Sequence, residues 1–335
     1  MKASFFPMIR FDRLLTLNLF GPLMKRIKVS NKPRIPILMY HSLSDDTENG
    51  IHPYYRINTS PKIFAEQMKF LHDNNYKVIS LSEAMHNIES QTVNRESQGV
   101  SGKTHTTATH NNLLTHSLIK STNPSNTTNS INLSNPVVLT FDDGYHDFLE
   151  KAFPILEKYE FTATIFLPTG FISDGGLSFK GKRCLHWREV RELAASGVQF
   201  GSHTISHPNL RDLHLDQVER EIWESKEILE NRIGTRVDSF SYPYAFPEED
   251  PRFKRRIRTS LAKAGYTIGV TTIIGTATQG NDRLFLKRIP VNSVDDPAFF
   301  RAKLDGGYDW IRGLQYGLKI LKWSLAVFNL KQIRP

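Results

Sequence analysis

Two adjacent carboxylates, Asp142 and Asp143, directly follow a short apolar run at residues 137–141. Such a run predicts a buried strand, and Gly144 allows the backbone to turn sharply after it. Because side chains alternate along a strand, the two carboxylates are expected to point in different directions. Two orientations suit two tasks, one as a proton acceptor and one as a metal ligand. At this point an acidic turn without chemistry is an equal alternative, since Asp and Gly both favour turns.

A second cluster with metal-binding potential contains His203 and His207, four residues apart. At this spacing both imidazoles can reach one ion at about 2.0–2.1 Å. Pro208 disfavours a helix through His207, so we place the pair in a turn between a strand and a loop. Two such histidines alone are weak evidence. Together with the strand-end acidic pair, they predict a site of two histidines and one carboxylate that leaves positions open for water and substrate.

The two clusters, taken together, resemble motifs of a known family. Thr140–Tyr145, with the sequence TFDDGY, and Gly201–Pro208, with the sequence GSHTISHP, resemble those of the polysaccharide deacetylases of the NodB-homology type, carbohydrate esterase family 4. The opening Ile35–Ser42 resembles the branch that contains the poly-N-acetylglucosamine deacetylases, in which the order of elements is permuted and a histidine strand comes first. The resemblance spans roughly residues 35–295, apart from one insertion. Further matching segments are Phe240–Tyr244, the Trp187 segment and Leu286–Val291.

The resemblance implies one divalent metal ion, held by Asp143, His203 and His207. Zn²⁺ is the expected ion, with Co²⁺, Ni²⁺ or Fe²⁺ as alternatives, and it would polarise the acetyl carbonyl. The implied reaction hydrolyses N-acetyl groups on N-acetylhexosamine residues of a polysaccharide or oligosaccharide and releases acetate. An N-acetylated glycan is therefore the expected partner.

The resemblance also assigns the proton transfers. Asp142 would take a proton from water, the backbone N–H of Tyr244 would help to hold the oxyanion, and His41 would protonate the departing amine. Imidazole suits that last role because its unperturbed pKa of about 6.5 lies close to working pH. Many relatives carry an arginine at the position of Ser241, where it contacts the catalytic aspartate, and this sequence departs from that pattern. We hypothesise that Arg288 takes this place; a plain surface arginine is the alternative.

Two other classes of function fit some of the same residues. A related metal-dependent amidohydrolase or phosphoesterase could use the same Asp and His ligands, because the ligands do not encode the acyl group. A non-catalytic glycan- or membrane-binding protein of the same fold is the other class. The pairing of Asp142 with Asp143 argues against it, because binding alone has no need of a proton acceptor beside a metal ligand.

Short strands and helical segments alternate along most of the chain, which predicts a parallel sheet covered by helices. Together with the resemblance, the alternation predicts an α/β fold, a distorted (β/α) barrel of about seven strands. His41 follows the first strand, at Ile35–Tyr40, and the carboxyl ends of such strands are where chemistry gathers. Ser60 and Pro61 give a helix-start signal, and Gly234 gives a helix stop. Trp187 is expected in the core by its spacing, whereas the family places an aromatic residue here in the groove wall.

The sequence divides into three parts. Residues 1–33 form an amphipathic N-terminal segment, residues 34–296 the deacetylase-like domain, and residues 297–335 a basic helical tail. Residues 90–135 are rich in Asn, Ser and Thr, which predicts a disordered insertion within the domain. We expect its histidines to be solvated rather than metal ligands; they are His105, His110 and His116.

The chain of 335 residues has a formal net charge of +9, which suits nucleic acid, anionic lipid or an acidic polymer. No zinc-finger spacing or basic helix with interleaved aromatics supports nucleic acid, so we expect no nucleic-acid partner. Cys184, the single cysteine, is expected to be a buried thiol. The terminal segments could contact a membrane surface, although packing on the domain is favoured. With no clear signal or run of about 18 apolar residues, we expect a cytoplasmic location and leave peripheral membrane contact open. The oligomeric state is not indicated.

Overall fold

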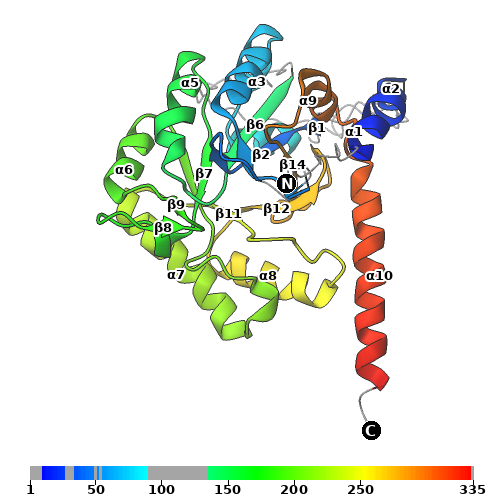
Figure 1. Ribbon diagram of the computed structural model, residues 1–335. Helices are drawn as coiled ribbons and strands as arrows, with labels where there is room; N and C mark the ends of the chain where they lie inside the picture. The colour runs from blue at the N-terminus through cyan, green and yellow to red at the C-terminus, as the bar shows by residue number, and fades with distance from the viewer. Residues whose placement is uncertain (1–9, 27–33, 49–50, 53–54, 90–134, 333–335) are drawn as a thin grey trace, which may run out of the picture.

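The computed structural model describes residues 10–26, 34–48, 51–52, 55–89 and 135–332. Seven parallel strands pair into a closed barrel, because the first and last of these seven, β2 and β6, also pair with each other (Figure 1). The seven-stranded (β/α) barrel expected from the sequence is thus confirmed. An eighth strand, β5 (Lys77–Val78), lies beside β6 outside the closed barrel. In order around the barrel the strands are β2 (Ile37–Tyr40), β14 (Leu286–Pro290), β12 (Ile268–Ile274), β11 (Ser239–Ser241), β10 (Gln199–Ser202), β7 (Thr164–Leu167) and β6 (Pro136–Phe141).

Helices cover the outside of the barrel, and local signals set their ends. Ser60 accepts a hydrogen bond from the Ile63 N–H, and Pro61 occupies the first position of α3. At the end of α7, Gly234 adopts a left-handed conformation with φ +72°, which glycine takes without steric penalty. Both signals were predicted from the sequence. The covering helical elements are α3 (Pro61–Asp73), a helix at 81–89, η3 (Phe148–Ala152), α5 (Phe153–Lys158), α6 (Trp187–Ala195), α7 (Leu215–Ile233) and α8 (Pro251–Lys263).

The barrel strands are buried on both faces, as expected for parallel strands covered by helices. Every residue of β2 and of β7 is buried. One strand carries a charge into this core: Arg288, in the middle of β14, is fully buried. Cys184 is a buried free thiol, as predicted, and burial raises its pKa to about 12, so it does not supply a thiolate.

A β-hairpin with a two-residue turn reaches towards the carboxyl end of the barrel. Its strands are β8 (Ser178–Phe179) and β9 (Lys182–Arg183), which pair antiparallel. The two turn residues, Lys180 and Gly181, have φ of +50° and +78°, the pattern of a type I′ hairpin turn. Four further short elements lie at this end, the parallel pair β3 (Ser42–Leu43) and β4 (Asn58–Thr59) and the turns η4 (Thr169–Phe171) and η5 (Leu210–Asp212). The antiparallel pair β1 (Arg34–Ile35) and β13 (Ala277–Thr278) lies towards the other end, because β1 directly precedes β2.

Segments from both ends of the described chain pack together beside the barrel (Figure 1). The rings of Phe20 and Trp310 stack with centroids 4.6 Å apart, and the indole N–H of Trp310 donates to Thr16 Oγ1 over 3.0 Å. Residues 10–26 of the N-terminal segment therefore pack against the rest of the described chain, which the sequence analysis favoured over membrane contact. The elements involved are α1 (Phe11–Leu15), η1 (Thr16–Phe20), α2 (Gly21–Arg26), α9 (Pro297–Leu304) and α10 (Ile311–Gln332).

The last of these helices, α10, extends away from the barrel (Figure 1). None of the helices in the described ranges is both long and apolar enough to cross a bilayer. Of the predicted insertion at 90–135, all but Asn135 lies outside the described residues, and so do its three histidines. The boundaries of the three-part division stay predictions.

Candidate active site

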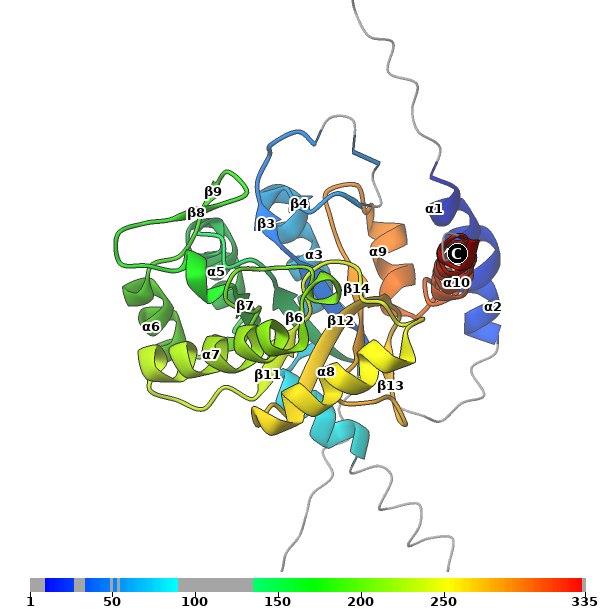
Figure 2. The same cartoon turned by 90° about the horizontal axis from the view of Figure 1, so that it is seen from below.

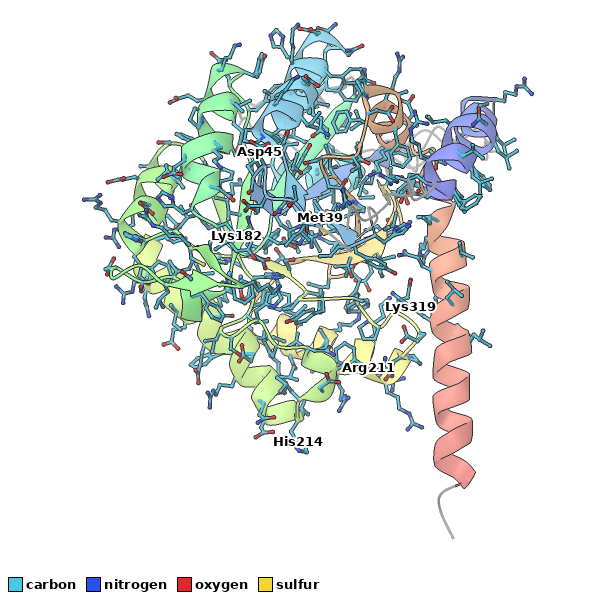
Figure 3. All side chains as sticks on the ribbon, viewed as in Figure 1. Met39, Asp45, Lys182, Arg211, His214 and Lys319 are labelled. Carbon is cyan, nitrogen blue, oxygen red and sulfur yellow. The ribbon has the colours of Figure 1, made fainter. Side chains whose placement is uncertain are left out.

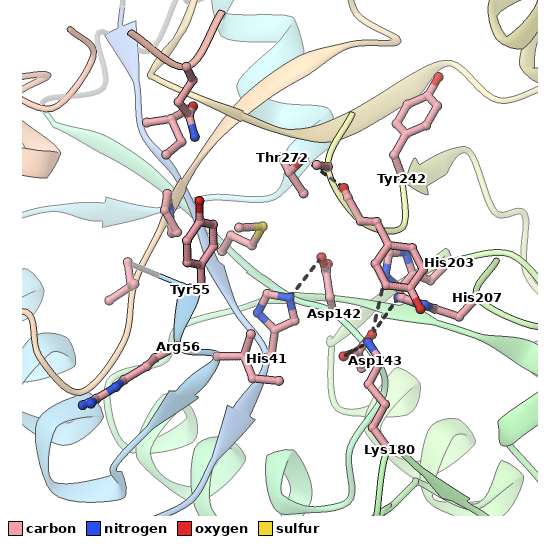
Figure 4. Close-up of a pocket in the computed structure, with 18 of the residues that line it drawn as sticks. His41, Tyr55, Arg56, Asp142, Asp143, Lys180, His203, His207, Tyr242 and Thr272 are labelled. Atoms are coloured by element: carbon pink, nitrogen blue, oxygen red, sulfur yellow. Dashed lines mark hydrogen bonds and ion pairs between the residues drawn. The ribbon is translucent and has the colours of Figure 1, made fainter. Parts of the chain in front are cut away.

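The barrel brings the predicted site residues to one end, the carboxyl end of its strands. His41 follows β2, the acidic pair follows β6, and His203 follows β10. In the pairing of β2 with β6, Tyr40 lies opposite Phe141, so the next residues, His41 and Asp142, emerge side by side. They border a cavity of about 340 Å³ (Figure 4). Of the seven predicted residues, this cavity is lined by His41, Asp142, Asp143, His203, His207 and Tyr244.

The three predicted metal ligands converge. Asp143 Oδ1 lies 3.2 Å from His207 Nε2 and 3.6 Å from His203 Nε2, and all three side chains are buried. Two ligands of one tetrahedral zinc ion, each about 2.0–2.2 Å from it, would be about 3.4 Å apart. Neither oxygen of Asp143 accepts a hydrogen bond of normal geometry from any described residue. A buried carboxylate with its lone pairs unused and two imidazole nitrogens facing it is the donor set that a divalent cation takes.

The protonation states also suit a metal. The Nδ1 of His203 lies 2.8 Å from the Ser241 carbonyl oxygen, so this nitrogen carries the proton and leaves the Nε2 lone pair free to face Asp143. Burial lowers the pKa of His203 to about 4, which keeps the imidazole neutral at neutral pH. Burial acts to raise the pKa of Asp143, but His207, His41 and His203 outweigh it and the pKa is lowered, so the carboxylate is ionised. Three protein ligands leave coordination positions open, as in catalytic sites.

Asp142 points to a different partner, Arg288. Both nitrogens of the guanidinium fork, Nη1 and Nη2, donate to the two carboxylate oxygens over 2.7 Å, and both side chains are buried. Its other hydrogen bonds go to the Thr271 carbonyl oxygen at 3.0 Å, to Ser241 Oγ at 3.0 Å and to Thr140 Oγ1 at 3.3 Å. Arg288 therefore lies beside Ser241 and contacts Asp142, where our hypothesis required a charged group. Its effect on catalysis stays a prediction.

The pKa of Asp142 reflects this pairing. Burial alone would raise it, but the charge of Arg288, the neighbouring His203 and the hydrogen bonds from Arg288 lower it below the usual value. His41 Nε2 lies 3.9 Å from Asp142 Oδ2, too far for a hydrogen bond. Burial lowers the pKa of His41, opposed by the charges of Asp142 and Asp143. The arrangement therefore places an ionised carboxylate and an imidazole in the same cavity as the metal-type cluster.

Tyr244 lies in the loop after β11, with its ring against that of His207 at a centroid distance of 4.7 Å. Its backbone N–H donates to no described residue, which leaves it available to a ligand. The hydroxyl of Thr272 fixes this loop, because it donates to the Tyr244 carbonyl oxygen over 3.0 Å and accepts from the Phe246 N–H over 2.9 Å. Thr272, on β12, is thus a positioning residue that the sequence alone did not reveal.

We expect Thr272→Val to lower kcat about tenfold with little change in KM. Valine keeps the size of the side chain but removes both hydrogen bonds, so the Tyr244 N–H loses its fixed direction at the stage when an oxyanion develops. Thr272→Ser, which keeps the hydroxyl, should retain most of the activity. Steady-state kinetics of both variants check this, and equal losses in both would show that packing rather than the hydroxyl matters.

Strained backbone gathers at this site. Among the described residues, eight non-glycine residues have positive φ, and three of them are Asp143 (+70°), His207 (+54°) and Tyr244 (+58°). Thr204, between the two histidines, has φ +70°, which is rare for a β-branched residue. Its hydroxyl accepts from the His207 N–H over 3.0 Å and holds the turn. Each such residue costs about 1–3 kcal/mol, and such strain is found where side chains must be aimed.

Lys180 is a cavity residue that the sequence analysis missed. It is the fifth of these positive-φ residues at the site, at the tip of the β8–β9 hairpin (Figure 4). Its Nζ lies 3.9 Å from Asp143 Oδ2 and 5.2 Å from the centroid of the Tyr244 ring. Nothing in the sequence near Lys180 signals that a hairpin tip would fold over the metal-type cluster.

We expect Lys180→Met to strengthen metal binding about fivefold. An ammonium group near Asp143 repels a second cation, and the repulsion is worth about 1 kcal/mol at this distance in a solvated setting. Lys182→Met in the same hairpin is the control, since that lysine pairs with Asp46 instead. Dissociation constants from chelator competition measure the effect, and weaker binding by Lys180→Met would show that the lysine supports the site.

Trp187 lies in the core with Val190 and Leu193, as its spacing predicted. It does not line the cavity, so the groove-wall role that the family resemblance implied is not found here. It opens α6, whose apolar side faces inward, so its ring is used for packing. Other residues from separate parts of the chain line the cavity instead, Tyr55, Arg56, Ile274, Gln315 and Lys319 among them.

Comparison with known proteins agrees with these motifs. The sequence profile of the family described as "Polysaccharide deacetylase" matches residues 129–269. "Putative polysaccharide deacetylase YxkH" of Bacillus subtilis is 29% identical over 266 residues, which are 79% of this chain and 74% of that protein. "Poly-beta-1,6-N-acetyl-D-glucosamine N-deacetylase" of Staphylococcus aureus is 24% identical over 172 residues, 49% of this chain and 56% of that protein.

Solved structures show the same fold. The Streptococcus pyogenes deacetylase PplD, in complex with acetate, has a TM-score of 0.59 and 23% identity, covering 82% of this chain and 99% of that one. IcaB from Ammonifex degensii has a TM-score of 0.56 and 18% identity, covering 82% and 97%. Residues 129–269 thus match the polysaccharide deacetylase family of hydrolases, and the named relative that covers most of the chain is a putative polysaccharide deacetylase.

Proposed function

We propose that the protein is a metal-dependent hydrolase that removes N-acetyl groups from N-acetylhexosamine residues of a glycan and releases acetate. The observation that carries the proposal is the adjacency of two carboxylates with separate partners in one cavity. Asp143 faces two histidines with its lone pairs unused, and Asp142 is held by Arg288. Relatives with names that specify N-acetylglucosamine deacetylation, such as the Staphylococcus aureus protein, support the choice of an N-acetyl group.

Asp143, His203 and His207 would hold the ion, and we expect Zn²⁺, with Co²⁺, Ni²⁺ or Fe²⁺ as alternatives. A divalent ion bound there supplies Lewis-acid polarisation of the acyl carbonyl. The His203 imidazole, fixed through Ser241, and the buried Asp143 carboxylate give the ion a set of donors that need little rearrangement.

The protein's own groups would perform the proton transfers. Asp142, kept ionised by Arg288, accepts a proton from the attacking water. The free N–H of Tyr244 donates to the oxyanion as the carbonyl carbon becomes tetrahedral. His41 then gives a proton to the amine as the C–N bond breaks. Acetate and the free amino sugar leave, and one water molecule is consumed.

Acetate release from N-acetylglucosamine oligomers tests the proposal. Metal-stripped protein should be inactive, and adding back zinc or cobalt should restore release. Asp142→Asn should bind the metal but lose turnover by about 10²–10⁴-fold, since it cannot accept the proton. Asp216→Asn, an exposed helix residue, is the control that should keep full activity.

A negative result in this assay can arise in two ways. No release, with about one ion bound per chain, would leave the metal site intact and direct attention to another amide or a phosphoester. No bound metal would overturn the metal-dependent mechanism itself.

A further inference from the structure

Exposed apolar side chains concentrate in one small part of the molecule. We name residues 10–26 and 311–321 the terminal lobe. Of the fourteen large hydrophobic residues that are exposed in the described part of the chain, eight belong to this lobe. They are Phe11, Leu14, Leu19, Leu23, Leu314, Tyr316, Leu318 and Leu321, with exposed fractions of 42–67%.

These side chains are arranged in stripes. Leu314, Leu318 and Leu321 follow one another at spacings of four and three along α10, so they share one face of the helix. Phe11 and Leu14 have a similar spacing in the N-terminal segment. Seen along the axis of α10, the N-terminal helices lie against it at the edge of the molecule away from the main helix layer (Figure 2). Exposed apolar side chains that gather in one part of a protein mark an interaction site.

Positive charge is concentrated in the two terminal segments of the chain, which include the lobe. Residues 1–33 contain seven Lys and Arg against one acidic residue, and residues 297–335 contain seven against two. The intervening 263 residues contain 29 basic and 31 acidic side chains. Three acidic residues of the domain neutralise part of the excess, since Asp295, Asp296 and Glu248 pair with Arg10, Arg13 and Arg312. The net positive charge of the chain therefore resides in its terminal segments.

An apolar face on a positively charged segment fits a bilayer with anionic headgroups. It fits a second copy of the same chain less well, because two such lobes would bring like charges together. We propose that the terminal lobe binds peripherally to an anionic lipid surface, with its exposed leucines and Phe11 in the interface.

The lobe is also connected to the cavity. Gln315 and Lys319, on α10, line the cavity at the same turns that carry Leu314 and Leu318 outward. Lys319 Nζ donates to the Phe246 carbonyl oxygen over 2.8 Å, in the loop that carries Tyr244, and lies on the barrel side of α10 (Figure 3). Lipid binding would thus hold the cavity beside the membrane. We infer that glycans held at a membrane surface are the preferred substrates, and this inference rests on the proposed deacetylase activity. The proposed lipid binding does not depend on that activity.

Vesicle co-sedimentation with the full-length protein tests the surface. We expect binding to phosphatidylcholine vesicles that contain phosphatidylglycerol, with weaker binding at high salt and to vesicles without the anionic lipid. The variant Leu314→Ser/Leu318→Ser/Leu321→Ser should bind more than tenfold more weakly. Because these side chains are exposed, the fold should be unaffected. Leu177→Ser/Leu215→Ser/Trp223→Ser, which removes exposed apolar residues elsewhere, is the matched control and should bind normally.

Two parallel measurements separate the outcomes. Acetate release from soluble oligomers should be equal in the leucine variant and the unaltered protein, so a failed deacetylase assay and a failed lipid assay remain distinct. Light scattering without vesicles reports association. If the unaltered protein forms a dimer that the leucine variant does not form, the apolar face binds a second copy of the chain and the proposal is wrong. Unchanged vesicle binding by the leucine variant would also overturn the proposal.

Discussion

Asp143→Ala is expected to lower metal affinity more than about a hundredfold and to reduce acetate release to background. Even changes in groups that only orient metal ligands cost about 10–100-fold in affinity. Within the described part of the chain, Asp143 is the one carboxylate that groups with the two histidines. Metal content after dialysis and acetate release measure the effect. Retention of both metal stoichiometry and activity would contradict the assignment of Asp143 as a ligand.

Thermal unfolding gives an independent readout of the same substitution. A ligand that binds only the folded state stabilises it by about 2.7 kcal/mol at a hundred times its Kd. Added zinc should therefore raise the Tm of the unaltered protein and of Asp216→Asn, and leave that of Asp143→Ala unchanged. An equal rise in all three would indicate that zinc binds elsewhere.

Arg288→Met should be the second severe substitution, because it removes the group that holds the proton acceptor. Asp142 would then be buried without its ion pair, and breaking a buried pair by removing one partner costs about 3–5 kcal/mol. Arg288 lowers the pKa of Asp142, so its loss should raise that pKa. Since the acceptor must be ionised, the acid limb of the kcat/KM profile should move to higher pH.

Two further variants distinguish this electrostatic role from packing. Arg288→Lys keeps the charge but cannot make the two-pronged contact, so it should shift the pH profile less than Arg288→Met while still losing turnover. In the double variant Asp142→Asn/Arg288→Met no charge is left unpaired, so the loss in unfolding free energy should be smaller than the sum of the two single losses. An unchanged pH profile in Arg288→Met would show that another group sets the ionisation of Asp142.

Much of the site followed from the sequence because its signals are local. A strand, an acidic pair and a glycine at 137–144 fix where Asp142 and Asp143 emerge, and Pro208 keeps the histidine pair out of a helix. Helix ends at Ser60 and Gly234 were equally local, since a cap depends on a few adjacent residues. The alternation of strands and helices predicted a parallel sheet covered by helices, and the family resemblance added the closed barrel.

The tertiary structure alone decided which distant groups meet. Arg288 reaches Asp142 across 146 positions of sequence only because β2 lies between β6 and β14 in the closed barrel. Lys180 faces Asp143 because a type I′ turn folds the hairpin tip over the strand ends. Local propensity carries no information on such contacts; they depend on the register in which the strands pair when the barrel closes. The sequence by itself thus determined the chemical groups and the strand ends that carry them, and barrel closure determined their partners.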